Sequence, residues 1–240
     1  ISAAIGQDYR RYFDWLGKNG ISTEHIKIID DEFTAGAFIT TDRADNQITG
    51  FNPGAMKYRS DLDLDLLRPG ETLMIVSPGN MDDMVHYPRA CKKRGVDYIF
   101  DPGQSLPMWN AGDLLETIEG CRILIVNDYE LNMIVGKTGL TRNDLLARAG
   151  TVITTLGELG SQVATADEKI DIRPVKPGKV EDPTGAGDSY RGGLISGLIR
   201  GMDIEQCARM GSVCASFAVE CYGTQEYRFT FDQFNERLKG

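Results

Sequence analysis

Short apolar runs alternate with amphipathic helical patterns along most of the chain. This alternation is typical of a parallel sheet whose strands are joined by helices on both faces. The predicted strands are 72–77, 98–101, 122–126 and 151–155, and the predicted helices are 9–18, 82–93, 111–118, 128–135, 142–149, 187–200 and 204–221. An antiparallel hairpin at the sheet edge is predicted at 162–166 and 170–173. The pattern therefore predicts an α/β fold, doubly wound, with a mostly parallel sheet between helices.

One region departs from this alternation. Residues 33–40 and 47–51 are rich in β-forming residues, and the polar turn 41–46 joins them, which predicts a hairpin. A protruding hairpin in an α/β enzyme is a candidate lid, although an ordinary edge hairpin fits the pattern equally well. We therefore expect a single domain over residues 1–240, with a small β lid at about 32–53.

Composition and charge exclude several classes of protein. With 26 basic and 35 acidic residues the net charge is −9, which disfavours a nucleic-acid partner. No apolar run reaches the roughly 20 residues of a membrane span, and the first residues lack the basic region of a signal peptide. The five cysteines form no CxxC pair, and only two histidines are present, which disfavours a zinc site or a Ser-His-Asp triad. These features indicate a reduced, cytoplasmic protein without membrane contact.

Polar clusters follow four of the predicted strands. In doubly wound sheets, ligands bind beyond the carboxyl ends of the strands, where such clusters would meet. The clusters lie at 77–80, 101–104, 127–130 and 155–157. Each alone could be a turn or a helix cap, but together they predict a binding site at one rim of the sheet.

The segment 180–189 carries the strongest chemical signal. It reads Val-Glu-Asp-Pro-Thr-Gly-Ala-Gly-Asp-Ser and precedes an apolar helical run. Glycines at a helix start expose backbone N–H groups that have no intrahelical partner, and the helix dipole there favours an anion. Asp188 would stand beside a bound phosphate as the general base for an attacking hydroxyl. The alternative is a capping aspartate after a glycine turn.

Two other motifs are incomplete. Gly136-Lys137-Thr138 looks like the end of a P-loop, but Leu131 stands where that motif needs a glycine. Gly-x-Gly-x-x-Gly fails as well, because Tyr190 occupies the third glycine position. A P-loop NTPase and a nicotinamide enzyme are therefore disfavoured.

The string Asp182-Pro183-Thr184-Gly185-Ala186-Gly187-Asp188 resembles the signature of the ribokinase-like (PfkB-type) sugar and nucleoside kinases. Further matches are Asn127-x-x-Glu130, Thr155-Leu156-Gly157-x-x-Gly160, Asn52-Pro53-Gly54-Ala55 and Gly6-x-Asp8. The resemblance covers essentially the whole chain and implies the three-layer ribokinase-like sandwich with its β lid. Family members normally begin with a further strand and lid segment, so we expect this chain to be truncated at its N-terminus. By itself, Asn127-x-x-Glu130 is equally a helix-capping pattern.

The resemblance also implies a reaction and its cofactors. ATP would donate its γ-phosphoryl group to a primary hydroxyl, with Mg²⁺ held through water by Asn127 and Glu130. A monovalent cation such as K⁺ is expected near Asp182. The catalytic positions are Gly185, Ala186, Gly187 and Asp188. The nucleotide-binding positions are Asn127, Glu130, Thr155, Gly157, Gly160, Asp182, Thr184 and Ser212.

The substrate prediction is narrower. Segments 98–104, 188–193 and 222–226 are similar to the adenosine-kinase-like branch of the family, which implies the 5′-OH of a purine ribonucleoside such as adenosine. A sugar kinase acting on ribose, fructose or ketodeoxygluconate is the alternative, and a non-catalytic nucleotide sensor is another. Ala37 and Phe38 would cover the substrate together with Asp188. They could instead pack the hairpin onto the sheet or onto the lid of a second subunit in a homodimer.

Overall fold

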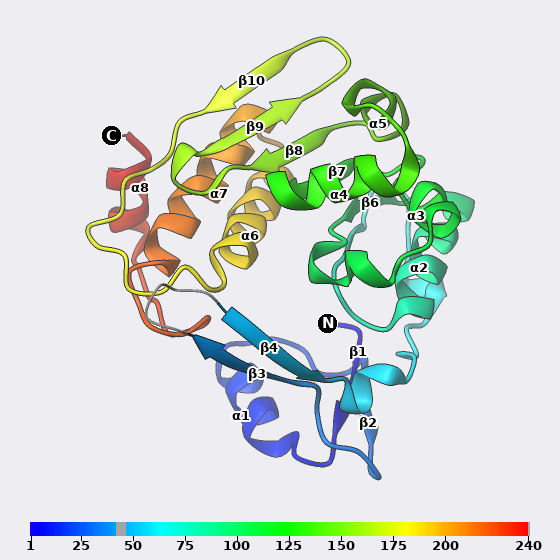
Figure 1. Ribbon diagram of the computed structural model, residues 1–240. Coiled ribbons are helices and arrows are strands. Elements are labelled where there is room, and N and C mark those ends of the chain that lie inside the picture. The colour runs from blue at the N-terminus through cyan, green and yellow to red at the C-terminus, as the bar shows by residue number, and fades with distance from the viewer. Residues whose placement is uncertain (42–46, 240) are drawn as a thin grey trace. The chain divides into compact units, whose positions relative to one another are not determined.

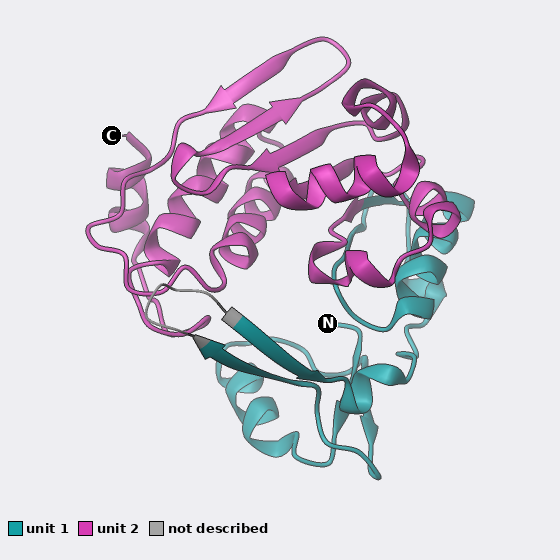
Figure 2. Cartoon of the chain, in the orientation of Figure 1, with its two compact units in different colours: residues 1–98 teal, residues 99–240 magenta. Residues whose placement is uncertain are grey.

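The computed structural model describes residues 1–41 and 47–239 (Figure 1). The chain forms two compact units, residues 1–98 and 99–240 (Figure 2). The assignment of residues 1–240 to a single domain stays a prediction. Most of the predicted turn at 41–46 lies outside the described residues.

Among its described residues, the first unit has two two-stranded sheets, two α-helices, two 3-10 helices and the further strand β5. Its elements are β1 (Ala3–Gly6), α1 (Arg10–Lys18), β2 (Ile26–Ile29), β3 (Gly36–Thr41), β4 (Gln47–Asn52), the 3-10 helices η1 (Gly54–Lys57) and η2 (Leu64–Leu66), β5 (Leu73–Val76) and α2 (Met81–Arg94). Strand β1 pairs in parallel with β2, and β3 pairs antiparallel with β4 from Gly36 opposite Asn52 to Thr41 opposite Gln47. The antiparallel pair confirms the hairpin that the sequence predicted from 33–40 and 47–51, whereas its assignment as a lid at about 32–53 stays a prediction.

Two glycines hold the base of this hairpin. A Cβ on Gly6 would lie 2.2 Å from the carbonyl carbon of Phe33, and a Cβ on Gly54 would lie 2.2 Å from the carbonyl oxygen of Phe33. The chain at Phe33 and Thr34 therefore runs where only glycine neighbours leave room. Asp8 accepts hydrogen bonds from the Thr34 amide at 2.9 Å and the Thr34 hydroxyl at 2.6 Å. We call Gly6, Asp8, Phe33, Thr34 and Gly54 the hairpin clamp.

The second unit is built on a mostly parallel sheet. Its elements are η3 (Gly103–Met108), α3 (Ala111–Ile118), β7 (Ile123–Asn127), α4 (Asp128–Thr138), α5 (Arg142–Arg148), β8 (Val152–Thr155), η4 (Gly157–Leu159), β9 (Ser161–Ala164), β10 (Lys169–Ile172), α6 (Ala186–Ile199), α7 (Ile204–Ala218) and α8 (Phe231–Lys239). Strand β6 (Asp97–Phe100) begins in the first unit and ends in the second. The sheet runs in the order β10-β9-β8-β7-β6, with β6, β7 and β8 parallel and β9 antiparallel to both of its neighbours. The predicted edge hairpin is therefore confirmed.

Helices α6 and α7 pack against each other through small residues. A Cβ on Gly193 would lie 2.5 Å from the carbonyl oxygen of Met210, and a Cβ on Gly211 would lie 2.9 Å from that of Tyr190. These glycines let the two backbones approach closely, and this approach fixes the position of α6.

Three differences from the predicted elements have physical reasons. Strand β2 was not predicted, because its sequence Ile-Lys-Ile-Ile is short and only partly buried. Helix α8 was not predicted either, because Phe234 is its only buried residue within the described part of the helix. That side chain joins a buried cluster with Met210, Val213 and Phe217 of α7. Helix α7 ends at Ala218 rather than at 221, so Cys221 lies beyond it.

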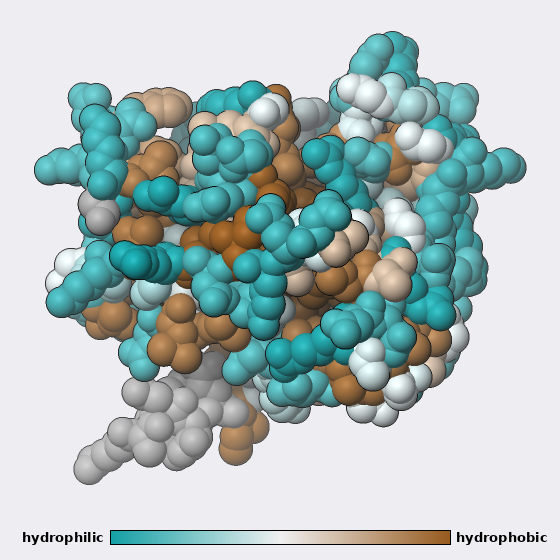
Figure 3. Space-filling model, turned by 90° about the horizontal axis from the view of Figure 1, so that it is seen from above, coloured by the Kyte–Doolittle hydropathy of each residue, from teal (hydrophilic) through white to brown (hydrophobic). Residues whose placement is uncertain are grey.

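Hydrophilic side chains are spread over the face of the molecule seen from above, with hydrophobic ones exposed between them (Figure 3). In the described part of the chain, no helix combines the length and the apolar character needed to cross a membrane.

Candidate functional site

The N-terminus of α6 forms the centre of the candidate site. Gly185 precedes the helix with φ of +84° and ψ of 0°, a left-handed conformation that favours glycine. Ala186, Gly187 and Asp188 form the first helical turn, so their amides have no intrahelical acceptor. We call residues 185–188 the anion loop.

One of the four amides predicted to hold an anion is already engaged. The Ala186 N–H donates to the carbonyl oxygen of Pro183 at 3.2 Å. Gly187 lies inside the helix, where a Cβ would come within 3.3 Å of Arg191 Nη1. The space beside Gly187 is therefore bordered by the end of a flexible side chain and not by backbone.

The residues that follow Asp188 anchor the helix. Ser189 donates to the Tyr227 hydroxyl at 2.8 Å, and the hydroxyls of Tyr190 and Ser161 hydrogen-bond each other at 2.8 Å. Burial raises the pKa of Tyr190 to about 12, so its hydroxyl stays protonated at neutral pH. Asp188 directly precedes these two residues, and 72% of its side chain is exposed. A carboxylate is thus held on a fixed backbone and presented to solvent.

Arg191 connects Asp188 to a buried carboxylate. Its Nη2 donates to Asp188 Oδ1, and its Nε lies 3.1 Å from Asp101 Oδ2. The Asp101 side chain is only 2% exposed and directly follows β6. From the sequence, Asp101 was predicted only as part of the strand-end cluster 101–104, and Arg191 was not predicted as a site residue. The available signal was the spacing of three residues between Asp188 and Arg191, which places them on one face of a helix.

Asp182 supports the start of the anion loop. Its Oδ1 accepts from the Thr184 amide at 2.9 Å, and its Oδ2 accepts from the Gly223 amide at 3.1 Å. Hydrogen bonds from the Thr184 side chain and amide, and then from the Gly223 amide, lower the pKa of Asp182 below its ordinary value. Asp182 therefore ties the loop to the segment after α7 as an ionised carboxylate.

Asn127 and Glu130 form a capping box at the start of α4. The Asn127 side chain accepts from the Glu130 amide at 2.7 Å, and the Glu130 carboxylate accepts from the Asn127 amide at 2.8 Å. The capping pattern that the sequence allowed is therefore present. The pair also lies at a strand end, because Asn127 is the last residue of β7.

Thr155 stands directly opposite Asn127 on the neighbouring strand β8. The turn after it needs glycine at two positions, because Gly157 has φ of +59° and Gly160 has φ of +91°. A Cβ on Gly160 would also lie 2.2 Å from the carbonyl oxygen of Ile172. The structure thus brings Asn127 and Thr155 together, as the rule on strand ends predicts.

The remaining predicted residues lie elsewhere. Ser212 lies within α7 and is 8% exposed. Ala37 and Phe38 belong to β3 in the first unit, where Phe38 is 72% exposed. A cavity of about 610 Å³ also lies within the first unit, lined in part by residues of β1, β5 and α2. Its lining includes neither Ala37 nor Phe38.

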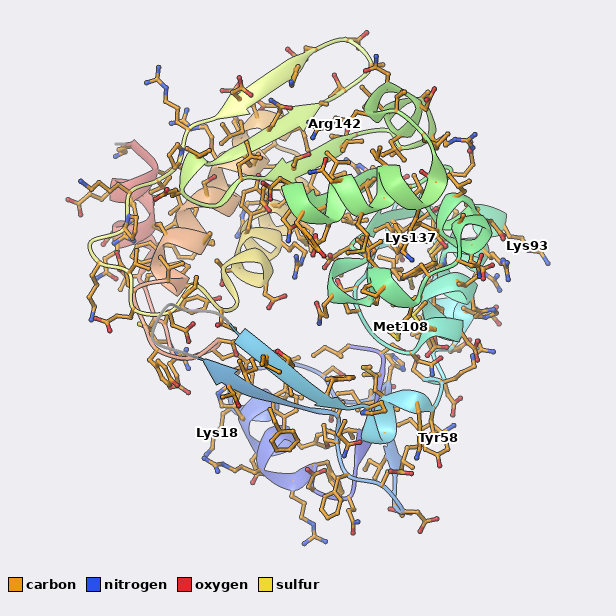
Figure 4. The ribbon with its side chains drawn as sticks, viewed as in Figure 1. Lys18, Tyr58, Lys93, Met108, Lys137 and Arg142 are labelled. Atoms are coloured by element: carbon orange, nitrogen blue, oxygen red, sulfur yellow. The ribbon has the colours of Figure 1, made fainter. Side chains whose placement is uncertain are left out.

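Lys137 of the incomplete P-loop motif has a structural partner. Its ammonium group donates to the carbonyl oxygens of Pro107 at 3.3 Å and Trp109 at 3.1 Å (Figure 4). The side chain thus links α4 to the end of η3.

Comparison with known proteins places these features in a context. The pfkB family carbohydrate kinase profile matches residues 1–229. A nucleoside kinase of Methanocaldococcus jannaschii is 37% identical over 242 residues, which cover 100% of this chain and 79% of that protein. The structure of Burkholderia thailandensis nucleoside kinase in complex with inosine superposes with a TM-score of 0.90 at 33% identity, covering 99% of this chain and 78% of that one. A second structure of that kinase, in complex with ADP-inosine, gives a TM-score of 0.89 at 33% identity, covering 99% of this chain and 75% of that one. These likenesses confirm the predicted fold.

Proposed function

Because this chain belongs to the pfkB family of carbohydrate kinases, we propose that it transfers the γ-phosphoryl group of ATP to the 5′-OH of a ribonucleoside. The predicted family and the predicted kinase class are confirmed by that membership. The nucleoside is supported by a relative named nucleoside kinase and by another whose structure contains inosine. The observation that carries the proposal is the exposed Asp188 carboxylate beside the amides of the anion loop.

Asp188 acts as the general base in this proposal. The substrate hydroxyl donates its proton to the carboxylate while its oxygen forms a bond to the γ-phosphorus. The bond between that phosphorus and the bridging oxygen breaks, and ADP leaves. The amides of Gly185, Gly187 and Asp188 stabilise the charge on the transferred group. The Ala186 amide contributes least, because it already donates to Pro183.

The residues that we assign to ATP and Mg²⁺ lie at or just after the ends of strands β7 and β8. Thr155, Gly157 and Gly160 would hold ATP at the end of β8. Asn127 and Glu130 act on Mg²⁺ through water, which fits their geometry because each already accepts a hydrogen bond from the other's amide. When bound, Mg²⁺ neutralises charge on the phosphates.

Three further positions complete the nucleotide site in this proposal. Thr184 contacts the phosphates from the start of the anion loop, and Ser212 faces the adenine. K⁺ would bind near Asp182, whose two carboxylate oxygens also accept N–H groups from Thr184 and Gly223.

The hairpin supplies the cover for the substrate. Phe38 is 72% exposed and Ile48 is 80% exposed, and they lie near each other across β3 and β4. An apolar surface of this kind suits a flat nucleobase better than a free sugar, which needs many hydrogen-bonding partners. Ala37 and Phe38 therefore cover the nucleoside, and exposed apolar residues of the hairpin pair two copies of the chain. We place the protein in the cytoplasm, with small molecules as its ligands and neither nucleic acid nor membrane as a partner.

A comparison of acceptors tests the substrate. We expect kcat/KM to be higher for adenosine, inosine and guanosine than for cytidine, ribose or fructose under one set of conditions. A sugar that leads by tenfold, about 1.4 kcal/mol of transition-state preference, would overturn the nucleoside assignment and leave the kinase assignment in place. ATP binding without phosphorylation of any acceptor would favour a nucleotide sensor.

The same assay tests the base. We expect Asp188→Asn to lower kcat by about 10²–10⁴-fold, the usual contribution of a positioned base, and to leave ATP affinity unchanged. The melting temperature should also stay close to that of the parent chain, because the side chain is exposed. Near-normal turnover by this variant would reject the catalytic role of Asp188.

A further inference from the structure

We infer that Arg191 is a positioning residue, which holds the Asp188 carboxylate in place from the buried anchor Asp101. This inference rests on the proposed function, in which Asp188 is the base. It adds two residues, Arg191 and Asp101, to the machinery that the family signature covers. It also gives a role to the polar cluster that follows β6.

The three side chains form a row from the interior to the surface. Asp101 is 2% exposed, Arg191 is 21% exposed and Asp188 is 72% exposed. A carboxylate buried as deeply as Asp101 needs a cationic partner, because an unpaired buried charge is strongly destabilising. Asp101 directly follows a strand of the central sheet, so its position is set by the sheet. The Nε of Arg191 is therefore held by a carboxylate whose position the sheet determines.

The Nη atoms of the guanidinium lie beside Asp188, the proposed base, and beside Gly187 of the anion loop. Its Nη2 donates to Asp188 Oδ1, and its Nη1 lies where a Cβ on Gly187 would be only 3.3 Å away. The missing side chain of Gly187 thus leaves room for the guanidinium beside the anion loop. The planar fork of arginine can contact both carboxylates at once, which the single ammonium of lysine does less well.

This arrangement has a chemical consequence. An exposed aspartate samples several rotamers, whereas a base must hold one oxygen within hydrogen-bond reach of the attacking hydroxyl. Because Arg191 binds Oδ1 and the Asp188 side chain is 72% exposed, Oδ2 is the oxygen that we assign to the substrate hydroxyl. The alternative is an ordinary surface ion pair between residues one helical turn apart, which contributes little to stability and nothing to turnover.

The test uses a double variant, which removes the buried Asp101 carboxylate together with the arginine that it contacts. In Asp101→Asn/Arg191→Ala the buried charge is removed together with its partner. We expect the melting temperature to stay within a few degrees of the parent and kcat to fall roughly tenfold to hundredfold, as for a misplaced catalytic group. KM for ATP should change less than threefold. Added guanidinium ion should restore part of kcat, whereas ammonium ion at equal concentration should not.

A matched control and a mutant cycle separate positioning from general damage. Arg148→Ala removes an exposed arginine of the same unit that pairs with Glu119, and it should leave kcat unchanged. In the Asp188→Asn background, the Asp101→Asn/Arg191→Ala change should lower kcat less than twofold further, because the base that it positions is already lost. Equal losses in both backgrounds would overturn the positioning role.

The results also separate the two proposals. Normal turnover by Asp188→Asn would reject the proposed base and, with it, the inference about Arg191. A slow Asp188→Asn together with a double variant that keeps parent-like kcat would reject only the role of Arg191.

Discussion

The hairpin clamp and the anion loop both depend on glycine, but for different reasons. In the clamp, the Cβ positions of Gly6 and Gly54 are occupied by the main chain at Phe33, at 2.2 Å. In the anion loop, the Cβ position of Gly187 meets only the end of the Arg191 side chain, at 3.3 Å. Main chain cannot move aside as a flexible side chain can. The clamp glycines are therefore required for packing, and Gly187 is required for access to the amides.

Substitution in the clamp should give the largest effect on stability. Gly6→Ala places a methyl group against the Phe33 backbone, so we expect a loss of roughly 1–3 kcal/mol in the free energy of unfolding. Gly17→Ala is the matched control, because Gly17 lies in α1 with nothing within 4 Å of the added Cβ. That control should stabilise the chain by about 0.5–1 kcal/mol. Equal melting temperatures for Gly6→Ala and the parent chain would contradict the clamp.

Substitution in the anion loop should affect activity instead. Gly187→Ala pushes the Arg191 guanidinium aside and narrows the approach to the amides, so we expect kcat/KM for ATP to fall about tenfold, or 1.4 kcal/mol. The melting temperature should change by less than it does for Gly6→Ala. Gly192→Ala, five residues further along α6 with open space around its Cβ, should keep parent-like kinetics. Parent-like kinetics in Gly187→Ala as well would contradict the access role.

Acid should weaken the hairpin clamp through Asp8 and the support of the anion loop through Asp182. The pKa of Asp8 is lowered by hydrogen bonds from the Thr34 side chain and amide, and that of Asp182 is lowered by those from Thr184 and then Gly223. A lowered folded-state pKa means that the ionised form stabilises the fold fully above the ordinary value of 3.8. This stabilisation is lost as the pH falls below 3.8 and through the lowered value.

The difference in melting temperature between the parent and each variant, Asp8→Asn or Asp182→Asn, measures this effect. We expect both differences to be constant from pH 7 to about pH 5 and to shrink below about pH 4. They should be the smallest of the effects predicted here, because both carboxylates are close to solvent. A difference that persists unchanged at pH 3 would show that the hydrogen bonds do not depend on the charge.

The sequence predicted features that are determined locally. Residues 122–126 are almost continuously apolar because β7 is buried on both faces, and the structure has that strand at Ile123–Asn127. The anion loop is equally local, because Gly185 and Asp188 lie within one helical turn. The sequence also showed that Asn127-x-x-Glu130 fits both a family motif and a helix-capping pattern. The capping pattern could be predicted because a capping box needs only these two residues.

Features that depend on tertiary contacts were not predicted. Arg191 reaches Asp101 only because α6 packs where it does, and 90 positions along the chain separate the two residues. Helix α8 is mostly polar and gains its place from the single buried side chain of Phe234 against α7. The clamp likewise joins Gly6 to Phe33 and Gly54 through close backbone contact, which no periodic pattern records.

The clamp has a consequence for engineering the acceptor preference of this protein. It contacts the hairpin at its base. Gly6 and Gly54 pack against the backbone of Phe33, and Asp8 accepts hydrogen bonds from the amide and the hydroxyl of Thr34. Asn52, at the end of the second strand, also bonds to the clamp, because its side chain accepts from the Gly54 amide at 3.2 Å. Residues 37–40 and 48–51 lie beyond this contact, and their side chains could be exchanged as a cassette. An engineer could graft the corresponding strands of a relative with another acceptor preference and leave the attachment point intact.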